Sequence, residues 1–251
     1  SADANYILDV DDEIQIQMFG GVEDNLQLKI KRSGDIDLPK VGPITLAGLS
    51  IGDAKKVVQK KVKEYFIDTD VVVSLSEVRD IKILVTGEVN FPGIYTLSGY
   101  SSALHAIGSA GGIKESGSFR KVVVKRNGKI IDQIDLYKIF IDADTSDIKS
   151  LRSGDSILVQ PTSKTIRVVG AVNRPAIFEY IDGEKAEDVI RFAGGFSIKS
   201  QDNLFFISRK SGSGFELLSS NIVSNTFLKD LDRIFVPFSE YDQDNLYLSE
   251  E

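Results

Sequence analysis

The chain contains 251 residues, of which 42% are hydrophobic and 27% are charged. These proportions are typical of an ordinary globular protein, and the length predicts one to three domains. The formal net charge of −7 at pH 7 excludes a general electrostatic attraction to nucleic acid or to anionic lipid. We therefore expect no nucleic-acid partner. The chain has no cysteine, which excludes disulfides, a thiol nucleophile and cysteine-based zinc sites.

The first predicted strand lies within residues 6–19, where Ile14, Ile16 and Met18 alternate with glutamines. Alternation of apolar and polar residues is the pattern of a half-buried strand. A second strand is expected at residues 26–30, and the Ser-Gly-Asp turn that follows makes a hairpin plausible.

Residues 39–43 contain two prolines and a glycine, which interrupt strand pairing and predict an irregular loop at a sheet edge. A helix is then predicted to run from the N-cap Ser50 to about Tyr65. Its apolar face holds Ile51, Ala54, Val58, Val62 and Tyr65. Five lysines in the same segment are explained more simply by a solvated helix face than by contact with an acidic polymer. A strand at residues 71–78 completes a first α+β module.

A stretch of sequence then occurs twice. Val85–Tyr95 reads VTGEVNFPGIY, and Val168–Phe178 reads VVGAVNRPAIF. An Ala-Gly-Gly triplet follows each copy, at residues 110–112 and 193–195, with the same offset of 83 positions. A constant offset through an ungapped stretch indicates a duplicated structural unit, because chance matches drift in register.

Each repeat has the same predicted order of elements. Strands at residues 81–85 and 165–169 lead into the Asn-Pro turns, and short helices are expected at residues 101–109 and 185–192. The double glycines end these helices, because glycine adopts the left-handed C-cap conformation without a steric penalty. Further strands follow, so each repeat is predicted to be a compact β-sheet folded over one helix.

No active-site pattern accompanies these elements. His105 is the sole histidine, and without cysteine or a second histidine the usual transition-metal sites cannot be assembled in one chain. It also lies outside any nucleophile-elbow pattern. Residues 142–153 resemble the start of a calcium loop, but Asp147 and Ser153 stand where glycine and glutamate are required.

Asp11, Asp12 and Glu13 are best explained as turn residues that enter a strand. Hydrolysis of a glycan by two acidic residues stays as an enzymatic alternative. Our expectation is that the protein is not an enzyme and has no catalytic residue, cofactor or metal site. The repeated loops are instead candidate ligand or subunit-contact sites, through Gly87, Asn90, Pro92, Gly111, Gly112, Gly170, Asn173, Pro175, Gly194 and Gly195.

The ordered set of modules resembles the outer-membrane polysaccharide export (Wza-like) family. The first module is similar to the polysaccharide export domain at Tyr6, Leu8, Asp12, Ile14, Ile16, Gly34, Ile36, Leu38-Pro39, Val41-Gly42 and Gly48-Leu49-Ser50. The repeats look like SLBB domains, which are β-grasp units, at Gly87, Val89, Pro92, Gly93 and residues 110–112, and at Gly170, Val172, Pro175 and residues 193–195. The chain departs from the family where Asp9 and Asp11 replace glycines and where Ala176 replaces the glycine of the Pro-Gly turn.

The resemblance implies a multi-domain α+β protein. We expect an export domain at residues 1–80, a first SLBB domain at 81–162, a second at 163–238 and an acidic tail at 239–251. Family members form rings in the periplasm, accept polymer from an inner-membrane polysaccharide co-polymerase and conduct capsular polysaccharide or exopolysaccharide outward. The implied partners are therefore polysaccharide, the co-polymerase and further copies of the chain.

The resemblance also implies a periplasmic location at the outer membrane. Wza-like members are anchored there by a lipid-modified cysteine and a C-terminal amphipathic helix, and neither occurs in this chain. Either these segments are missing from the sequence or a separate outer-membrane partner is needed. The alternative function is a periplasmic carbohydrate-binding or assembly accessory that uses SLBB domains without forming a conduit.

Overall fold

The structure is a computed structural model that describes residues 6–145, 148–201, 204–211, 213–219 and 227–239. The chain divides into two compact units. The first unit comprises residues 1–84, 93–109 and 148–156, and the second comprises residues 85–92, 110–147 and 157–251. Of the predicted acidic tail, residues 240–251 lie outside the described residues.

An antiparallel sheet forms the framework of the first unit. Its strands, in spatial order, are β2 (Asp24–Lys29), β1 (Glu13–Gly20) and β5 (Thr69–Glu77). The predicted alternation is confirmed, because Ile14, Ile16 and Met18 on β1 are buried at 1%, 0% and 5% exposure. Ile16 is paired with Val73 of β5, so one face of the sheet carries the core of this unit.

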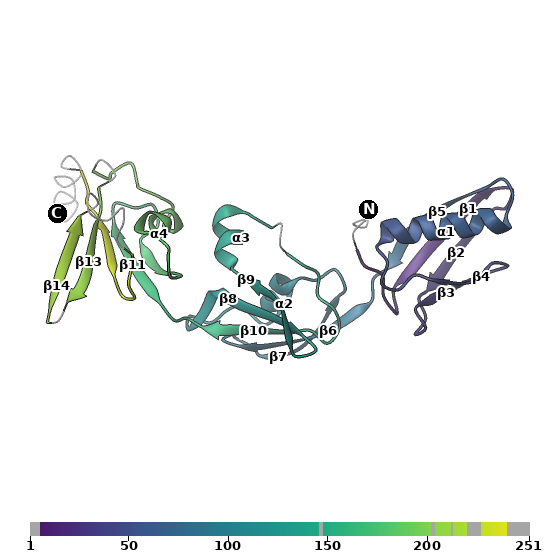
Figure 1. The fold of residues 1–251 in the computed structure, drawn as a ribbon, viewed down its shortest axis with the longest axis horizontal. Helices are drawn as coiled ribbons and strands as arrows, with labels where there is room; N and C mark the ends of the chain where they lie inside the picture. Colours follow the sequence, from purple (N-terminus) through teal and green to yellow (C-terminus); the bar gives the residue numbers. More distant parts are fainter. Residues whose placement is uncertain (1–5, 146–147, 202–203, 212, 220–226, 240–251) are drawn as a thin grey trace, which may run out of the picture. The chain divides into compact units, whose positions relative to one another are not determined.

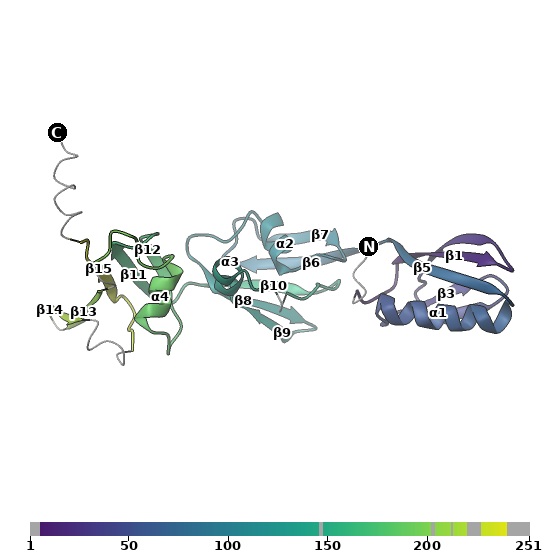
Figure 2. The ribbon, with the colours of Figure 1, turned by 90° about the horizontal axis from the view of Figure 1, so that it is seen from above.

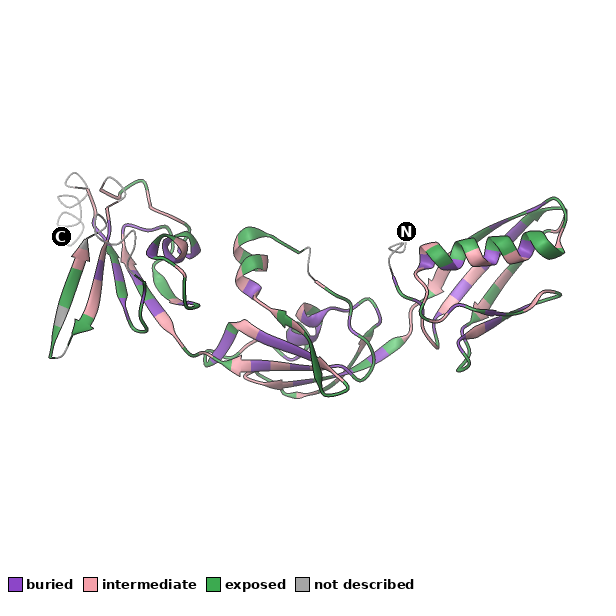
Figure 3. Cartoon of the chain, viewed as in Figure 1, coloured by how far each residue is buried: buried purple, intermediate pink, exposed green. Residues whose placement is uncertain are grey.

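Helix α1 (Ile51–Tyr65) lies along this sheet (Figures 1 and 2). The backbone N–H of Asp53 donates to Oγ of the N-cap Ser50 at 3.1 Å, as the sequence predicted. The buried face holds Ile51, Ala54, Val58 and Val62, and buried and exposed residues alternate along the helix in Figure 3. Burial of each valine stabilises the fold by about 1.5–3 kcal/mol. Tyr65 does not join this face, because it is the last helical residue and is 56% exposed.

The prediction of an irregular loop at residues 39–43 is wrong from Gly42 onward. Strand β4 (Gly42–Thr45) pairs with β3 (Asp35–Leu38) in a two-stranded antiparallel sheet, with Pro43 opposite Asp37. Proline is tolerated there because a two-stranded sheet has only edge strands, and the missing N–H of proline can face away from the partner strand.

The two repeats have the same sheet topology. The first sheet has the order β7-β6-β10-β8-β9, and the second has the order β12-β11-β15-β13-β14. The first set is β6 (Asp80–Gly87), β7 (Gly93–Ser98), β8 (Gly117–Arg126), β9 (Lys129–Ile134) and β10 (Ser156–Pro161). The second set is β11 (Thr165–Gly170), β12 (Ala176–Glu179), β13 (Phe206–Ser211), β14 (Gly214–Ser219) and β15 (Arg233–Val236). Taken in chain order, the strands of one repeat correspond to those of the other, which confirms the duplication.

Each repeat contains the predicted short helix, namely α2 (Ala103–Ser109) and α4 (Ala186–Phe192). In the second repeat, Val189 and Ile190 of α4 belong to the same buried core as Val168 of β11 and Ile234 of β15. The strands β11 and β15 run parallel, with Val168 beside Ile234. A sheet folded over one helix is the arrangement that the sequence predicted.

Helix α3 (Leu136–Asp142) is an element that the sequence did not predict. It lies in the segment between β9 and β10, where the repeats lose their common register. Asp135 caps it, since its carboxylate accepts a hydrogen bond from the backbone N–H of Tyr137 at 3.0 Å. Tyr137 and Ile141 pack against the core of the second repeat, so this short helix is held by tertiary contacts.

Candidate functional site

The predicted loop residues come together in each repeat and determine the shape of the loops. Gly87 and Gly170 have φ angles of +83° and +88°. A Cβ atom on Gly87 would lie 2.1 Å from the carbonyl oxygen of Val159, and one on Gly170 would lie 2.0 Å from that of Val236. The positive φ angle and the lack of space for a Cβ atom both disfavour every other residue type. The backbone of each repeat therefore requires glycine at this position.

The two asparagines join each turn to the end of the helix. The side-chain Nδ2 of Asn90 donates to the carbonyl oxygen of Gly111, and Nδ2 of Asn173 donates to that of Gly194, both at 2.7 Å. Gly111, Gly112, Gly194 and Gly195 all have positive φ angles between +77° and +86°. The Asn-Pro turn and the double glycine therefore form one rigid loop pair at the surface of each repeat, and Pro92 and Pro175 are exposed in these turns.

The substitution of Ala176 for the family glycine does not change the turn. The corresponding Gly93 has no positive φ, and a Cβ atom there would meet the Tyr95 ring at 3.8 Å, an ordinary contact. Asp11, which also replaces a glycine, adopts a φ of +73°. Aspartate tolerates this conformation better than most residues, so both departures fit the local backbone.

The loop pairs differ at one position. Phe91 lies over Gly111 and is 68% exposed, whereas its counterpart Arg174 lies over Gly194. Nη2 of Arg174 donates to the carbonyl oxygen of Phe192 at 3.2 Å. One loop therefore presents an apolar side chain and the other presents a cation.

Arg120 on β8 holds together several segments of the second unit. Its guanidinium donates to the carboxylates of Asp135 and Glu184, with closest contacts of 2.7 Å to each. It also lies over the rings of Tyr137 and Phe192, at 4.9 Å and 5.1 Å from their centroids. Burial alone would lower the pKa of Arg120, but hydrogen bonds to Glu184 and Asp135 outweigh it and raise that pKa. The charge is therefore permanent and fully paired.

Glu179 at the end of β12 makes a second set of contacts. Its buried carboxylate accepts hydrogen bonds from Oγ of Ser118 at 2.5 Å and from the backbone N–H of Phe119 at 2.6 Å. Its backbone N–H donates to the Tyr137 hydroxyl at 3.1 Å. Burial raises the pKa of Tyr137, which keeps that hydroxyl protonated. Together with Arg120, these bonds tie β8 and α3 to β12 and α4.

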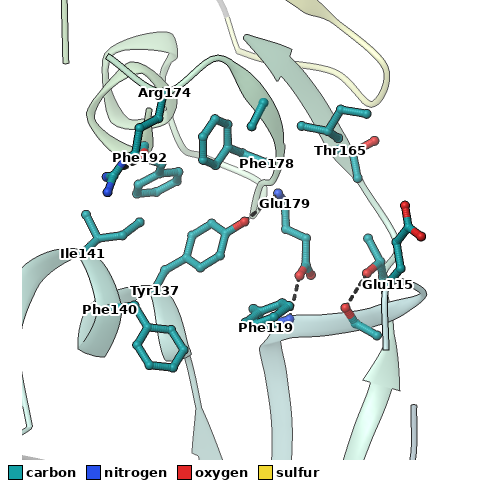
Figure 4. A pocket seen from close by; sticks show the side chains of 14 residues that line it. Glu115, Phe119, Tyr137, Phe140, Ile141, Thr165, Arg174, Phe178, Glu179 and Phe192 are labelled. Carbon is teal, nitrogen blue, oxygen red and sulfur yellow. Dashed lines mark hydrogen bonds between the residues drawn. The ribbon is translucent and has the colours of Figure 1, made fainter. Parts of the chain in front are cut away.

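A groove of about 620 Å³ lies beside these contacts (Figure 4). Its lining is mainly apolar and includes Phe119, Tyr137, Phe140, Ile141, Phe178 and Phe192. Polar groups at its rim include Arg174, Glu115 and Thr165. Sequence reasoning missed this groove, because its walls come from the unpredicted α3 and from strands distant in the chain. The available signal was the aromatic-rich segment at residues 137–140.

A buried polar cluster lies in the first unit. The carboxylate of Asp12, which is 0% exposed, accepts hydrogen bonds from the Tyr6 hydroxyl at 2.9 Å and from Nη1 of Arg79 at 2.6 Å. The backbone N–H groups of Asp9 and Arg79 donate to the same carboxylate at 2.8 Å and 2.9 Å. The sequence interpretation of Asp12 as a turn residue was therefore incomplete, because its backbone N–H does close a turn on the carbonyl oxygen of Asp9 at 3.2 Å but its carboxylate is the buried centre of this cluster.

The other candidate chemistry is sparse. His105 is exposed, and its Nδ1 lies 3.0 Å from Oγ of Ser102. Within the described ranges, no group of three or more histidine and acidic side chains could hold a metal ion. No helix in the part of the chain that the structure describes is long and apolar enough to cross a membrane.

Family comparisons match all three modules. A family model described as polysaccharide biosynthesis/export protein matches residues 1–76, and two SLBB domain models match residues 81–159 and 165–215. The chain is 34% identical over 178 residues to the polysialic acid transport protein KpsD of Escherichia coli, covering 70% of this chain and 32% of KpsD. It is 28% identical over 202 residues to the EPS I polysaccharide export outer membrane protein EpsA of Ralstonia solanacearum, covering 77% of this chain and 53% of EpsA. The chain thus spans about a third to a half of the length of these relatives.

Proposed function

Because this chain belongs to the polysaccharide export family, with an export domain followed by two SLBB domains, we propose that it is a component of a machine that exports capsular polysaccharide or exopolysaccharide. The observation that carries the proposal is the ordered set of three modules, in which the two repeats share one sheet topology. KpsD and EpsA are named for polysaccharide transport and export.

The proposed mechanism is passage of a polymer without bond chemistry. Copies of the chain surround a hydrated lumen, and weak polar contacts let the polymer slide. The net charge of −7 supports this mechanism, because repulsion discourages an anionic polymer from adhering to the wall. The protein works in the periplasm at the outer membrane, and an inner-membrane polysaccharide co-polymerase supplies the polymer.

The loop pair of the first repeat is proposed as a subunit contact, and the loop pair of the second repeat is proposed as a ligand contact. Each is rigid, because an asparagine side chain and two glycines with positive φ determine its shape. Rigid exposed loops associate at a low cost in conformational entropy. Phe91 is the most apolar group on them and is 68% exposed, which supports contact with a neighbouring copy. A head-to-tail contact of this kind closes into a ring when its rotation permits.

Removing the gene from a producing cell tests the export function. We expect polymer of unchanged chain length to accumulate within the cell envelope, and the full-length protein to restore polymer at the cell surface. Undiminished surface polymer in the deletion strain contradicts export. Shortened polymer on restoration contradicts passage without bond chemistry and favours the hydrolytic alternative.

The ring is tested through Phe91→Ser in the full-length protein, with Ile198→Ser as the matched control. Both residues are apolar and exposed, at 68% and 102%, but Ile198 is not part of a loop pair. We expect sedimentation to show smaller assemblies for the Phe91 variant only. Equal assembly masses for the two variants refute the loop contact. A full-length protein that is strictly monomeric and binds glycan favours the accessory role.

A further inference from the structure

The groove between α3 and β12 has features that the export mechanism above does not use. Phe140 and Ile177 in its lining are 62% and 55% exposed, and Phe119 is 37% exposed. Exposed large apolar side chains that lie together on one concave surface are typical of a binding site. Its volume of about 620 Å³ lies within the range of small-ligand pockets.

Arg174 gives the groove a specific charge. Among the residues that the structure describes, no carboxylate lies within ion-pairing distance of Arg174, in contrast to the fully paired Arg120. One hydrogen bond to the carbonyl oxygen of Phe192 orients the guanidinium and leaves its other donors available. A guanidinium presents a planar fork of N–H groups that matches a carboxylate with two parallel hydrogen bonds.

The polar groups are separated along the groove. Figure 4 places Arg174 at one end and Glu115 at the other, with the rings of Phe178 and Tyr137 between them. Thr165 adds a hydroxyl on the side away from Arg174. A ligand that fits must therefore combine an apolar face, an acidic group and hydroxyls that can bond to Glu115 and Thr165.

A sugar ring that bears a carboxylate has this combination. One face of a pyranose exposes polarised C–H groups, and the negative face of an aromatic ring attracts them. We propose that the groove binds a carboxylate-bearing saccharide unit, with its ring against the aromatic wall and its carboxylate on Arg174. This inference rests on the proposed function and names a contact point for the polymer.

The aromatic wall is held in place before any ligand arrives. The rings of Tyr137 and Phe192 meet edge to face with centroids 5.1 Å apart, and Arg120 lies against both. The Tyr137 hydroxyl is bonded to the backbone of Glu179. A preorganised site loses little entropy on binding. A single cation on a protein of net charge −7 gives a weak and reversible hold, which suits a polymer that must move on.

The test measures binding of trigalacturonic acid and its neutral counterpart galactotriose to the full chain, by calorimetry and saturation-transfer NMR. We expect a millimolar Kd for the acidic sugar and a Kd about tenfold higher for the neutral one, because a charge-assisted hydrogen bond is lost. Arg174→Gln is expected to bind the acidic sugar about tenfold more weakly, at the level of the neutral one.

Two further variants separate the two parts of the site. Lys210→Gln also removes one exposed positive charge from the second repeat, but Lys210 does not line the groove, so binding should not change. Phe140→Ala removes an exposed ring and should weaken the binding of both sugars by a similar factor. Far-ultraviolet circular dichroism checks that each variant is folded.

Three results overturn the inference. The first is no detectable binding of the acidic sugar at about 10 mM, a concentration well above the expected millimolar Kd. The second is equal binding of the two sugars with no effect of Arg174→Gln. The third is self-association of the chain that Phe140→Ala abolishes, because a second copy would then cover the groove. None of these results alters the export phenotype of the deletion strain, so the proposed function is judged separately.

Discussion

Replacing Asp12 with asparagine removes a charge from a carboxylate that has no exposure to solvent. The carboxylate accepts hydrogen bonds from Tyr6, Asp9 and Arg79, and the Arg79 side chain is only 8% exposed. Once the amide of asparagine replaces this carboxylate, the remaining ion pair of Arg79 is with Asp9 at 3.6 Å, and the Asp9 side chain is half-exposed. Breaking a buried ion pair on one side costs about 3–5 kcal/mol, because the remaining charge is left uncompensated.

Because asparagine keeps the shape and one acceptor oxygen, we expect Asp12→Asn to lower the free energy of unfolding by about 2–4 kcal/mol, somewhat below the cost of a fully broken pair. Urea unfolding at pH 7, followed by circular dichroism, measures this change. The matched control is Asp11→Asn, which affects an exposed ion pair with Lys29 whose side chains are 67% and 61% exposed. Such a pair contributes about 0–1 kcal/mol.

The reasoning is refuted if the two variants lose the same amount of stability. A double-mutant cycle gives a second check, because Arg79→Met should cost less in the Asp12→Asn background than in the wild type. Additive losses would mean that Asp12 and Arg79 do not stabilise each other, whatever the distance between them.

The remaining predictions concern a glycine and a tyrosine. Gly170→Ala should lower the free energy of unfolding by about 2–5 kcal/mol, because alanine is strained at positive φ and its Cβ atom displaces the Val236 carbonyl. The control Gly93→Ala should change the free energy of unfolding by less than about 0.5 kcal/mol. Equal losses of stability for the two variants in thermal melts would contradict the assigned role of Gly170. Burial, followed by the nearby Asp12 carboxylate, raises the pKa of Tyr6 above its usual value of 10.0. The folded state therefore holds this proton more tightly, so its stabilising contribution is complete below pH 10.0 and is lost as the pH rises further. Tyr6→Phe should reduce the loss of stability measured above pH 10.0, and an unchanged loss in this variant would contradict the assignment to Tyr6.

The sequence predicted the elements whose signals are local. Alternation at Ile14, Ile16 and Met18 indicated β1, and Ser50 with the apolar spacing behind it indicated α1. The constant offset between the repeats indicated two copies of one fold, and the double glycines indicated the helix ends. These predictions are confirmed because hydrophobic period, capping and backbone strain act over a few residues. The export family was also identifiable from the order of the modules.

The groove and the buried polar clusters were decided by tertiary structure. Arg120 meets Asp135 and Glu184 across 15 and 64 positions of sequence, and Arg79 meets Asp12 across 67. Helix α3 has only seven residues, and helices this short are not stable without packing. The prediction of a loop at Pro43 was wrong because proline is tolerated in β4 only where its missing N–H faces the unpaired edge of the sheet, and the sequence does not show which edge is unpaired. Pairings between distant segments depend on how sheets and helices pack, and no local pattern in the sequence records that packing.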